Sequence, residues 1–600
     1  MPGGSLVEQR LQSLRDVMAV GAIDACVALS SDPHLSEYLP PRWQGRQWLS
    51  GFSGSAGTLV VTAGFAGLWT DSRYWEQAEA ALAGTGIQVQ RAGAEQVPGP
   101  AQWLAANLPA GAVVSVPGDV LSLQAHRQWL DELSPRRIRL ALDRDPLSEI
   151  WSDRPGLPQG RVYEHPAPFA CRTRGENLAA VRSAMAEQGA QWHWLSSLDD
   201  IAWLFNLRGN DVSFNPVFLS HALIGADTAR LFVDLSKIDD ALRRRLERDG
   251  VDIEPYDQAG PALACLAQGE RLLVDPVRTT VGVLAAAAFA DKVEALNPSQ
   301  RLKSRKNAAE IGHVRRAMEQ DGAALCEFFA WLESALGSQT ITELAIDEEI
   351  TKARSRRANF VCPSFGTIAA FNANGAMPHY HATPQSHAVI EGDGLLLIDS
   401  GGQYLGGTTD ITRVVPVGRV DDAQRRDYTV VLKGMIALSQ AVFPAGTAGA
   451  SLDAIARLPI WQSGAEFGHG TGHGVGYFLN VHEGPQSISH RAKITPDTGI
   501  AEGMITSNEP GLYRPGRWGV RIENLILAVP AMKTEFGEFL AFETLTLCPI
   551  DTRCIEPTLM RADEIAWLDA YHAQVRQRLL PLVDGPARDW LLRRTQALAR

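Results

Sequence analysis

Hydrophobic and polar positions change their spacing near residue 307, and this change divides the chain into two regions. Before it, short apolar runs alternate with amphipathic stretches, which predicts α/β structure. After it, IGHVRRAMEQDGAALCEFFAWLESAL has apolar residues at helical spacing, and Asn307 with Glu310 supplies a capping pair at its start. A second helix is predicted over TELAIDEEITKARSRR, residues 342–357.

From Phe360 onward, short apolar strands are separated by Gly, Pro and Asn, which predicts a β-rich core wrapped by helices. The tail returns to helical spacing in MRADEIAWLDAYHAQVRQRLLPLV and again in ARDWLLRRTQAL. The C-terminal half is therefore predicted to be an α+β domain.

Two stretches rich in proline or charge interrupt these patterns. They are DPLSEIWSDRPGLPQGRVYEHPAP, residues 145–168, and NPSQRLKSRK, residues 297–306. Because proline is excluded from helix interiors and central strands, the first stretch indicates a domain boundary. The sequence predicts three domains, at 1–150, 151–305 and 306–600.

The first two of these regions resemble each other. One reads DACVALSSDPHLSEYL and then GTLVVTAGFAGLWTDSRY; the other reads QWHWLSSLDDIAWLFNL and then VFLSHALIGADTARLFVD. Both run from a strand through a Ser-rich turn and a helix start to a strand pair around Gly. We predict two related α/β modules; the alternative is a chance similarity of short segments.

Composition sets outer limits on function. Six hundred residues exceed a single core, and the net charge of -12 disfavours nonspecific binding of nucleic acid. There is no run of about 20 apolar residues and no apolar signal core at the N-terminus, so we expect no membrane span and a cytoplasmic protein. The seven cysteines form no CxxC and fit reduced core thiols better than a disulfide framework or a zinc finger.

Five side chains in the last third of the chain carry the candidate chemistry. Each lies in an apolar or glycine-rich segment, where an unpaired charge is unfavourable: Asp399 in LLLIDSGG, Asp410 in GGTTDITRVV, His473 in HGTGHGVG, Glu509 in ITSNEPG and Glu523 in GVRIENLILAV. Four carboxylates and one imidazole suit two divalent metals. Because structural zinc prefers thiolate and imidazole, the set favours Mn(II), Co(II) or a catalytic Zn(II) pair over a structural zinc site.

Each carboxylate taken alone also has an ordinary interpretation. Asp399 and Asp410, on two strands of a predicted hairpin, would cap loop amides, and Glu523 would form a salt bridge with Arg521. The alternative for Arg521 is a position behind a metal-binding carboxylate. Taken together the residues favour a metal cage, and two metals about 3.5 to 4 Å apart acidify a bridging water. This predicts a hydrolase acting on an amide or ester.

Imidazoles accompany the acidic residues. HGTGHGVG places His469 and His473 four residues apart, and its four glycines exclude the helical HExxH zinc motif. We expect one of the two to bind metal and the other to face substrate. Further imidazoles are His379 and His381 in PHYH and His482 in NVHEGP. Any one of them alone would be interpreted as a structural histidine.

The motifs IDSGG, TTDITR, HGTGHGVG, NVHEGP, NEPG and RIEN resemble those of the pita-bread metallopeptidases, which include methionine aminopeptidase, prolidase and aminopeptidase P. FSGSAGT, LWTDSRYW, WLFNLRGNDVSFNPVF, the helix after residue 305 and TLTLCPID with WLDAYH resemble the three-domain cytosolic form of aminopeptidase P. The resemblance covers nearly the whole chain. It implies two creatinase-like N-terminal α/β modules followed by a pita-bread catalytic domain.

The resemblance also implies a dinuclear site. Asp399 would bind one metal, Asp410 and Glu523 would bridge both, and His473 and Glu509 would complete the second. The expected cofactor is a pair of divalent ions. Mn(II) is the preferred assignment, and Zn(II) and Co(II) are the alternatives.

The implied reaction is release of the N-terminal residue from peptides with proline in second position, by attack of a metal-bridging hydroxide on the X-Pro amide. Glu509 would also be a general base, and His379, His469 and His482 would line the substrate site. A homodimer is implied as well. The alternatives are a prolidase, which has one N-terminal module, and a pita-bread binding protein without catalysis. Asn508 and Leu512 depart from the family pattern, where we expect Asp and an aromatic residue.

Overall fold

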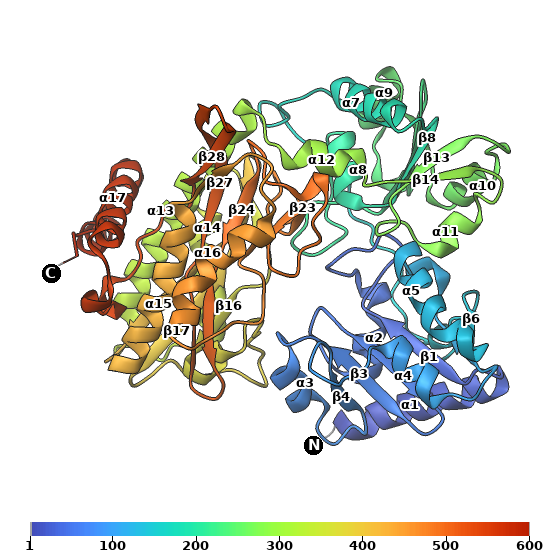
Figure 1. Ribbon diagram of the computed structural model, residues 1–600, viewed down its shortest axis with the longest axis horizontal. Helices are drawn as coiled ribbons and strands as arrows, with labels where there is room; N and C mark the ends of the chain where they lie inside the picture. The colour runs from blue at the N-terminus through green and yellow to red at the C-terminus, as the bar shows by residue number, and fades with distance from the viewer. Residues whose placement is uncertain (1–2, 599–600) are drawn as a thin grey trace. The chain divides into compact units, whose positions relative to one another are not determined.

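The computed structural model describes residues 3–598, which fall into two compact units. The first unit comprises the chain up to residue 165 together with residues 172–299, and the second comprises residues 166–171 and the chain from residue 300 onward (Figure 1). None of the helices within residues 3–598 combines the length and apolar character that a bilayer span requires. The seven cysteines are free thiols, as their spacing predicts. The prediction that all lie in the core is wrong for three of them, since Cys265 is exposed and Cys171 and Cys362 are partly exposed.

The first unit contains two six-stranded sheets of the same topology. The first sheet has the order β4-β3-β2-β1-β5-β6 and the second has the order β12-β11-β10-β8-β13-β14. In both, the first strand in sequence pairs antiparallel with one neighbour and parallel with the other. The strands are β1 (Ala25–Leu29), β2 (Thr58–Thr62), β3 (Ala66–Thr70), β4 (Gln88–Arg91), β5 (Val113–Ser115), β6 (Arg139–Ala141), β8 (Trp192–Leu195), β10 (Ser220–Gly225), β11 (Ala229–Val233), β12 (Asp252–Pro255), β13 (Arg271–Val274) and β14 (Asp291–Glu294). This identity of order and direction confirms the two related modules.

Helices cover both faces of the first sheet because its strands are apolar on both faces. Leu59 and Val61 of β2 enter one core together with Leu11 and Leu14 of α1 (Gly3–Val20). Val60 of β2 enters a second core with residues of α4 (Pro100–Asn107) and α5 (Leu123–Leu133). This alternation follows from the two-residue period of a strand.

The second unit begins its long helix where the sequence predicts. The helix α13 spans Ala308–Ala335, and the Asn307 side chain accepts hydrogen bonds from the amides of Ala309 (2.9 Å) and Glu310 (3.0 Å). The Glu310 carboxylate accepts one from the Asn307 amide at 2.8 Å, which completes a capping box. The other main helices are α14 (Glu343–Ser355), α15 (Asp422–Ser439), α16 (Gly449–Gln462), α17 (Ala562–Leu579) and α18 (Gly585–Arg594).

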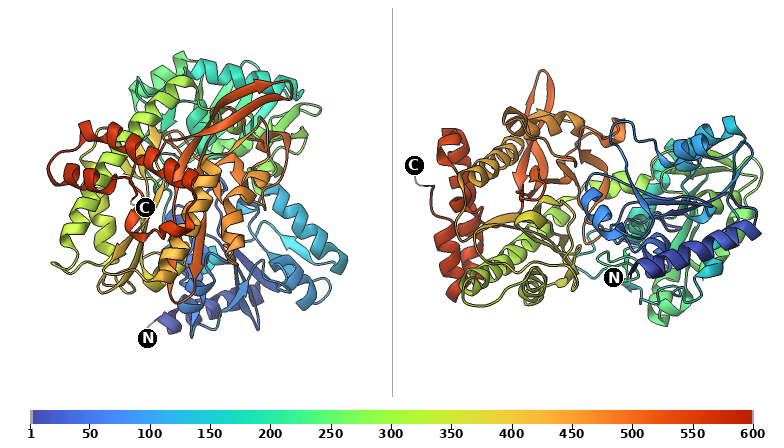
Figure 2. Two further views of the ribbon diagram at one scale, coloured as in Figure 1. Left: turned by 60° about the vertical axis from the view of Figure 1, so that its left-hand side comes forward. Right: turned by 90° about the horizontal axis from the view of Figure 1, so that it is seen from below.

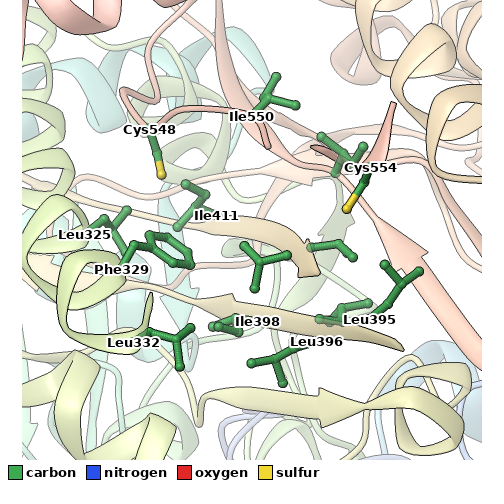
Figure 3. Packing of buried hydrophobic residues seen from close by; sticks show 14 of the residues in the cluster. Leu325, Phe329, Leu332, Leu395, Leu396, Ile398, Ile411, Cys548, Ile550 and Cys554 are labelled. Atoms are coloured by element: carbon green, nitrogen blue, oxygen red, sulfur yellow. The ribbon is translucent and has the colours of Figure 1, made fainter. Parts of the chain in front are cut away.

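Helices pack against the strands of this unit around one large apolar core. Leu325, Phe329 and Leu332 of α13 lie against the apolar side chains of β17 (Gly394–Ser400) and β20 (Ile411–Val417) (Figure 3). The helices α17 and α18 pack on α13 in turn (Figure 2). The strands form two three-stranded sheets, β16-β17-β20 and β15-β18-β19, a six-stranded sheet, β21-β28-β27-β24-β22-β23, and the pair β25-β26. With the two modules, this arrangement confirms the predicted fold class.

The remaining strands of the second unit are β15 (Phe360–Pro363), β16 (Ile368–Phe371), β18 (Gly402–Tyr404), β19 (Gly407–Thr408), β21 (Val442–Pro444), β22 (Gly472–Gly474), β23 (Glu483–Ile488), β24 (Ile505–Asn508), β25 (Gly511–Arg514), β26 (Trp518–Arg521), β27 (Asn524–Thr534) and β28 (Gly537–Thr544).

The basic stretch at residues 297–306 is not a solvated linker. A short helix, α12 (Pro298–Ser304), forms within it. Lys303 and Lys306 are buried. Their ammonium groups lie 3.3 and 2.5 Å from the Glu483 carboxylate, which compensates for the burial of their charges. Lys303, Lys306 and Glu483 thus form a buried ion cluster, and Glu483 directly follows His482 in the chain.

Candidate metal centre

Asp399 and Asp410 are brought together by a strand hairpin. Asp399 lies near the end of β17, and Asp410 directly precedes β20. The two strands pair antiparallel, with Asp399 opposite Thr412 and Ser400 opposite Ile411. Both carboxylates therefore lie at the same end of the ladder, as the sequence predicts.

The other three residues come from the six-stranded sheet and its borders. His473 is the central residue of β22, Glu509 directly follows β24, and Glu523 directly precedes β27. The strand β24 pairs with both β22 and β27, so their ends meet at one edge. The glycines beside His473 make this possible: a Cβ on Gly472 would lie 1.8 Å from the Ser507 carbonyl oxygen, and one on Gly474 would lie 2.1 Å from that of Glu483.

The functional atoms converge on a small volume. One ligand atom each from Asp410, His473 and Glu523 lies within 4.8 Å of the other two. The His473 Nε2 atom is 3.6 Å from Asp410 Oδ2 and 3.4 Å from Glu509 Oε1. Its Nδ1 atom lies 3.0 Å from the Gly474 carbonyl oxygen, to which Nδ1–H donates, so the lone pair of Nε2 points at the carboxylates.

Arg521 lies behind the cluster and pairs with Asp399. Its guanidinium contacts Asp399 Oδ2 at 2.6 Å and donates to the Thr412 hydroxyl at 3.2 Å. Thr412 in turn donates to Glu523 Oε2 at 2.7 Å. The partner of Arg521 is thus Asp399 rather than Glu523, the residue two positions along the chain.

Burial and mutual repulsion define the electrostatics of the carboxyl groups. Burial, followed by the charges of neighbouring carboxylates, raises the pKa values of Asp410 and Glu523 well above their ordinary range. Burial also raises the pKa of Glu509 to about 7, against the opposing effect of Arg521. The Asp399 Oδ1 atom is buried and accepts no hydrogen bond from any residue between 3 and 598.

These observations fit divalent cations. Four acidic groups face a single guanidinium, an acceptor atom is left unused, and the donor set is oxygen-rich with one imidazole nitrogen. Hard and borderline divalent ions prefer such donors. The residues able to hold two of them are Asp399, Asp410, His473, Glu509 and Glu523.

We expect the stability of the metal-free protein to fall as pH rises from about 4.5 to about 7 because of this cluster. The carboxyls have higher pKa values in the folded protein than in the unfolded chain, so the folded state retains protons that the unfolded chain has released. Bound cations remove this penalty. The increase in melting temperature on adding Mn(II) should therefore grow from pH 5 to pH 7.5, measured by calorimetry with and without chelator.

Comparing the two forms at each pH cancels the titration of the rest of the protein. Glu509→Gln, which removes one of the raised groups, should weaken the dependence. An equal stabilisation by metal at every pH in this range would show that the carboxyls are not protonated in the metal-free protein.

The histidines occupy distinct places. His469 is held by both ring nitrogens, with Nδ1 2.8 Å from the Gly470 carbonyl oxygen and Nε2 2.7 Å from the Tyr513 hydroxyl. The His482 ring lies edge-on to the His473 ring, with 4.3 Å between centroids. His379 follows Pro378, whose carbonyl accepts from Arg521 at 3.3 Å.

Two groups of supporting residues were missed in the sequence. Tyr513 accepts a hydrogen bond from Arg521 at 2.7 Å and donates to His469, so it joins the guanidinium to the imidazole. On α16, the buried Arg457 donates to the carbonyl of His469 at 2.5 Å and pairs with Asp453 at 2.6 Å. An Asp and Arg four apart on a helix normally indicate a surface pair, so no local signal identified this one.

The two departures from the family pattern face the protein interior. The Asn508 amide donates to the carbonyl of Met435 at 2.8 Å and to the Ser439 hydroxyl at 3.0 Å. Leu512 lies in the large apolar core. Asn508 therefore contacts α15, and Leu512 lies in the core to which α15 contributes.

Comparison with known families gives four matches along the chain. Residues 312–530 match metallopeptidase family M24, and residues 538–598 match the C-terminal region of this peptidase family. Residues 10–140 and 153–310 each match the creatinase/prolidase N-terminal domain.

Similar proteins extend over the full length. A probable Xaa-Pro aminopeptidase P of Paracoccidioides brasiliensis (strain Pb03) is 37% identical, covering 98% of this chain and 99% of its own. Aminopeptidase P2 of Arabidopsis thaliana is 36% identical, covering 99% and 89%.

A solved structure agrees with these relatives. The crystal structure of X-prolyl aminopeptidase from Caenorhabditis elegans, described as a cytosolic enzyme with a di-nuclear active site, superimposes with a TM-score of 0.93 at 30% identity, covering 98% of this chain and 99% of that one. The chain belongs to metallopeptidase family M24, among the aminopeptidases P.

Proposed function

We propose that this enzyme releases the N-terminal residue from peptides whose second residue is proline, using two divalent metal ions. The observation that carries the proposal is the convergence of Asp410, His473 and Glu523 within 4.8 Å, with Asp399 and Glu509 beside them. The names of the full-length relatives supply the preference for proline.

The roles of the individual ligands are those that the resemblance to the family implies. Asp410 and Glu523, whose ligand atoms belong to the converging group, would bridge the two ions, and Asp399 would bind one of them. His473 and Glu509, which contact each other at 3.4 Å, would complete the other. We propose Mn(II) as the metal, with Zn(II) or Co(II) as alternatives.

The metals would supply Lewis acidity towards the scissile carbonyl and an acidified water. Glu509 would take the proton of the attacking water and deliver it to the proline nitrogen as the amide bond breaks. His379 and His482 would orient the peptide and donate hydrogen bonds to the developing oxyanion. His469, whose ring nitrogens are engaged by the Gly470 carbonyl and the Tyr513 hydroxyl, would line the substrate site. Arg521 would hold the Asp399 carboxylate in place, because it pairs with that carboxylate at 2.6 Å.

Proline in second position explains why a dedicated site is useful. The X-Pro bond is a tertiary amide without an N–H, and the ring fixes φ. A peptidase that must hold the scissile N–H cannot act on it. Cleavage by polarising the carbonyl and protonating the leaving nitrogen requires no such contact.

We also propose three domains, at 1–150, 151–305 and 306–600; the matched ranges support this division. The proposal extends to a homodimer that works in the cytoplasm on free peptides, without nucleic acid or membrane partners. The description of the Caenorhabditis elegans relative as cytosolic supports the location.

The test is an assay of Mn(II)-loaded protein on Arg-Pro-Pro and on Arg-Pro. We expect release of arginine from the tripeptide, loss of activity after chelation and recovery on adding Mn(II). Because the family members with two N-terminal modules are aminopeptidases, the dipeptide should be the poorer substrate. Activity restricted to Arg-Pro would instead identify a prolidase, and full activity without metal would exclude the metal centre.

A further inference from the structure

The segment that carries His379 is tied to the protein at a single buried carboxylate. This segment, residues 371–390, leaves the end of β16 and returns at Ile390, whose amide donates to the Ile341 carbonyl at 2.8 Å. Glu343, the first residue of α14, lies beneath it and is completely buried. The proposed metal chemistry assigns no role to this residue.

Both oxygens of Glu343 are occupied by donors from the His379 segment. Oε1 accepts from the Phe371 amide at 2.7 Å and from the Asn374 side-chain amide at 2.9 Å. Oε2 accepts from the Tyr380 hydroxyl at 2.8 Å and from the Ala388 amide at 2.7 Å. The carboxylate therefore joins the start, the middle and the end of the segment, and Tyr380 directly follows His379.

No cationic side chain in residues 3–598 pairs with Glu343, so these hydrogen bonds alone compensate for its burial. The arrangement needs an acceptor on both oxygens. An amide in place of the carboxylate would turn one acceptor into a donor and set it against N–H or O–H donors of the segment.

Helix capping does not account for this residue. The N-cap of α14 is Thr342, whose hydroxyl accepts from the Ala345 amide at 3.3 Å. An acidic group in the first turn of a helix is favourable on its own, but such groups are normally solvated. The Glu343 side chain is instead directed at the donors of the His379 segment.

We propose that Glu343 is a positioning residue: it fixes the segment 371–390 so that the His379 imidazole is held at the substrate. The inference rests on the proposed role of His379. It predicts that loss of the carboxylate acts on catalysis only through His379.

The test is a double-mutant cycle on Arg-Pro-Pro cleavage with Glu343→Gln, His379→Ala and the double variant. We expect Glu343→Gln to lower kcat/KM by about 10- to 100-fold, the range seen when a supporting partner of a site residue is removed. His379→Ala should lower it further, and adding Glu343→Gln to His379→Ala should change little. The ratio of metal to protein should stay that of the wild type.

Glu348→Gln is the matched control, because Glu348 is exposed on the same helix. Should Glu343→Gln fail to fold, Tyr380→Phe removes one donor only and should show a several-fold loss with the same non-additivity. Hydrogen exchange of peptides from residues 371–390 should be faster in either variant.

The outcomes distinguish a failure of the positioning role of Glu343 from a failure of the proposed function. A further equal loss on adding Glu343→Gln to His379→Ala, or a Glu343→Gln variant that behaves like Glu348→Gln, overturns the inference and leaves the proposed function intact. A wild-type protein without activity on Arg-Pro-Pro overturns the function itself. A fully active His379→Ala overturns the role of His379, and the positioning role with it.

Discussion

Asp410→Asn is expected to lower kcat/KM on Arg-Pro-Pro by about a thousandfold or more. Asp410 is buried among Asp399, Glu509 and His473, and in the proposed arrangement it holds both metals. Lewis acidity from the metals is worth several kcal/mol in the transition state, and each 1.36 kcal/mol is about tenfold in rate. Steady-state kinetics together with the metal content of the purified variant measures the effect.

The same variant should lose activity without losing stability in the metal-free form. In the metal-free protein, an asparagine side chain at this position carries no charge and relieves the repulsion that raises the pKa values of the neighbouring carboxyls. The melting temperature of the variant without metal should equal or exceed that of the wild type. Addition of Mn(II), which should stabilise the wild type by about 2.7 kcal/mol at a hundredfold excess over Kd, should have little effect on the variant.

Asp422→Asn is the matched control for this experiment. Asp422 is exposed at the start of α15, where its charge contributes only a few tenths of a kcal/mol through the helix dipole. It should retain metal and activity. An Asp410→Asn variant that still binds two ions and turns over normally would remove Asp410 from the metal centre.

The features that local physics determines were predictable from the sequence. Asn307 and Glu310 start α13 because an N-cap side chain and an acid three residues on satisfy the first amides, whatever the rest of the fold. The hairpin of Asp399 and Asp410 follows from two apolar runs joined by a glycine-rich loop. The acidic cluster was detectable because charge in an apolar strand requires compensation.

The features set by distant segments were not predictable. Arg521 pairs with Asp399 because β26 and β17 lie side by side in space, and no local pattern encodes that neighbour. Lys303 and Lys306 have the sequence signature of a solvated linker, yet Glu483, far along the chain, makes their burial tolerable. Glu343 looks like an ordinary first-turn acid until the segment 371–390 is folded onto it.

A common principle connects these supporting contacts. The loops that carry the imidazoles are glycine-rich or irregular, so they do not fix their own side chains. Buried charges on neighbouring helices fix them instead: Arg457 on α16 holds the carbonyl of His469, and Glu343 on α14 holds the segment of His379. The rigid helices thus provide the precision that the loops lack.

His482→Ala is expected to lower kcat by about 10²- to 10⁴-fold while the metal content stays unchanged. The ring lies edge-on to His473 and is not among the ligand atoms of Asp410, His473 and Glu523 that converge within 4.8 Å. In the proposed arrangement it faces the substrate. The next residue, Glu483, is fixed by Lys306, so the backbone should keep its place after truncation. Loss of a positioned proton donor has an effect of this size.

His387→Ala is the control, since His387 is exposed and its Nδ1 atom lies 2.9 Å from the Thr383 carbonyl oxygen, away from the acidic cluster. The two measurements on His482→Ala distinguish its roles, because a ligand and a proton donor fail differently. A proton donor lost from an intact centre lowers turnover at full metal occupancy. If His482→Ala loses metal in proportion to activity, and excess Mn(II) restores both, then His482 is a ligand and the donor set contains two imidazoles.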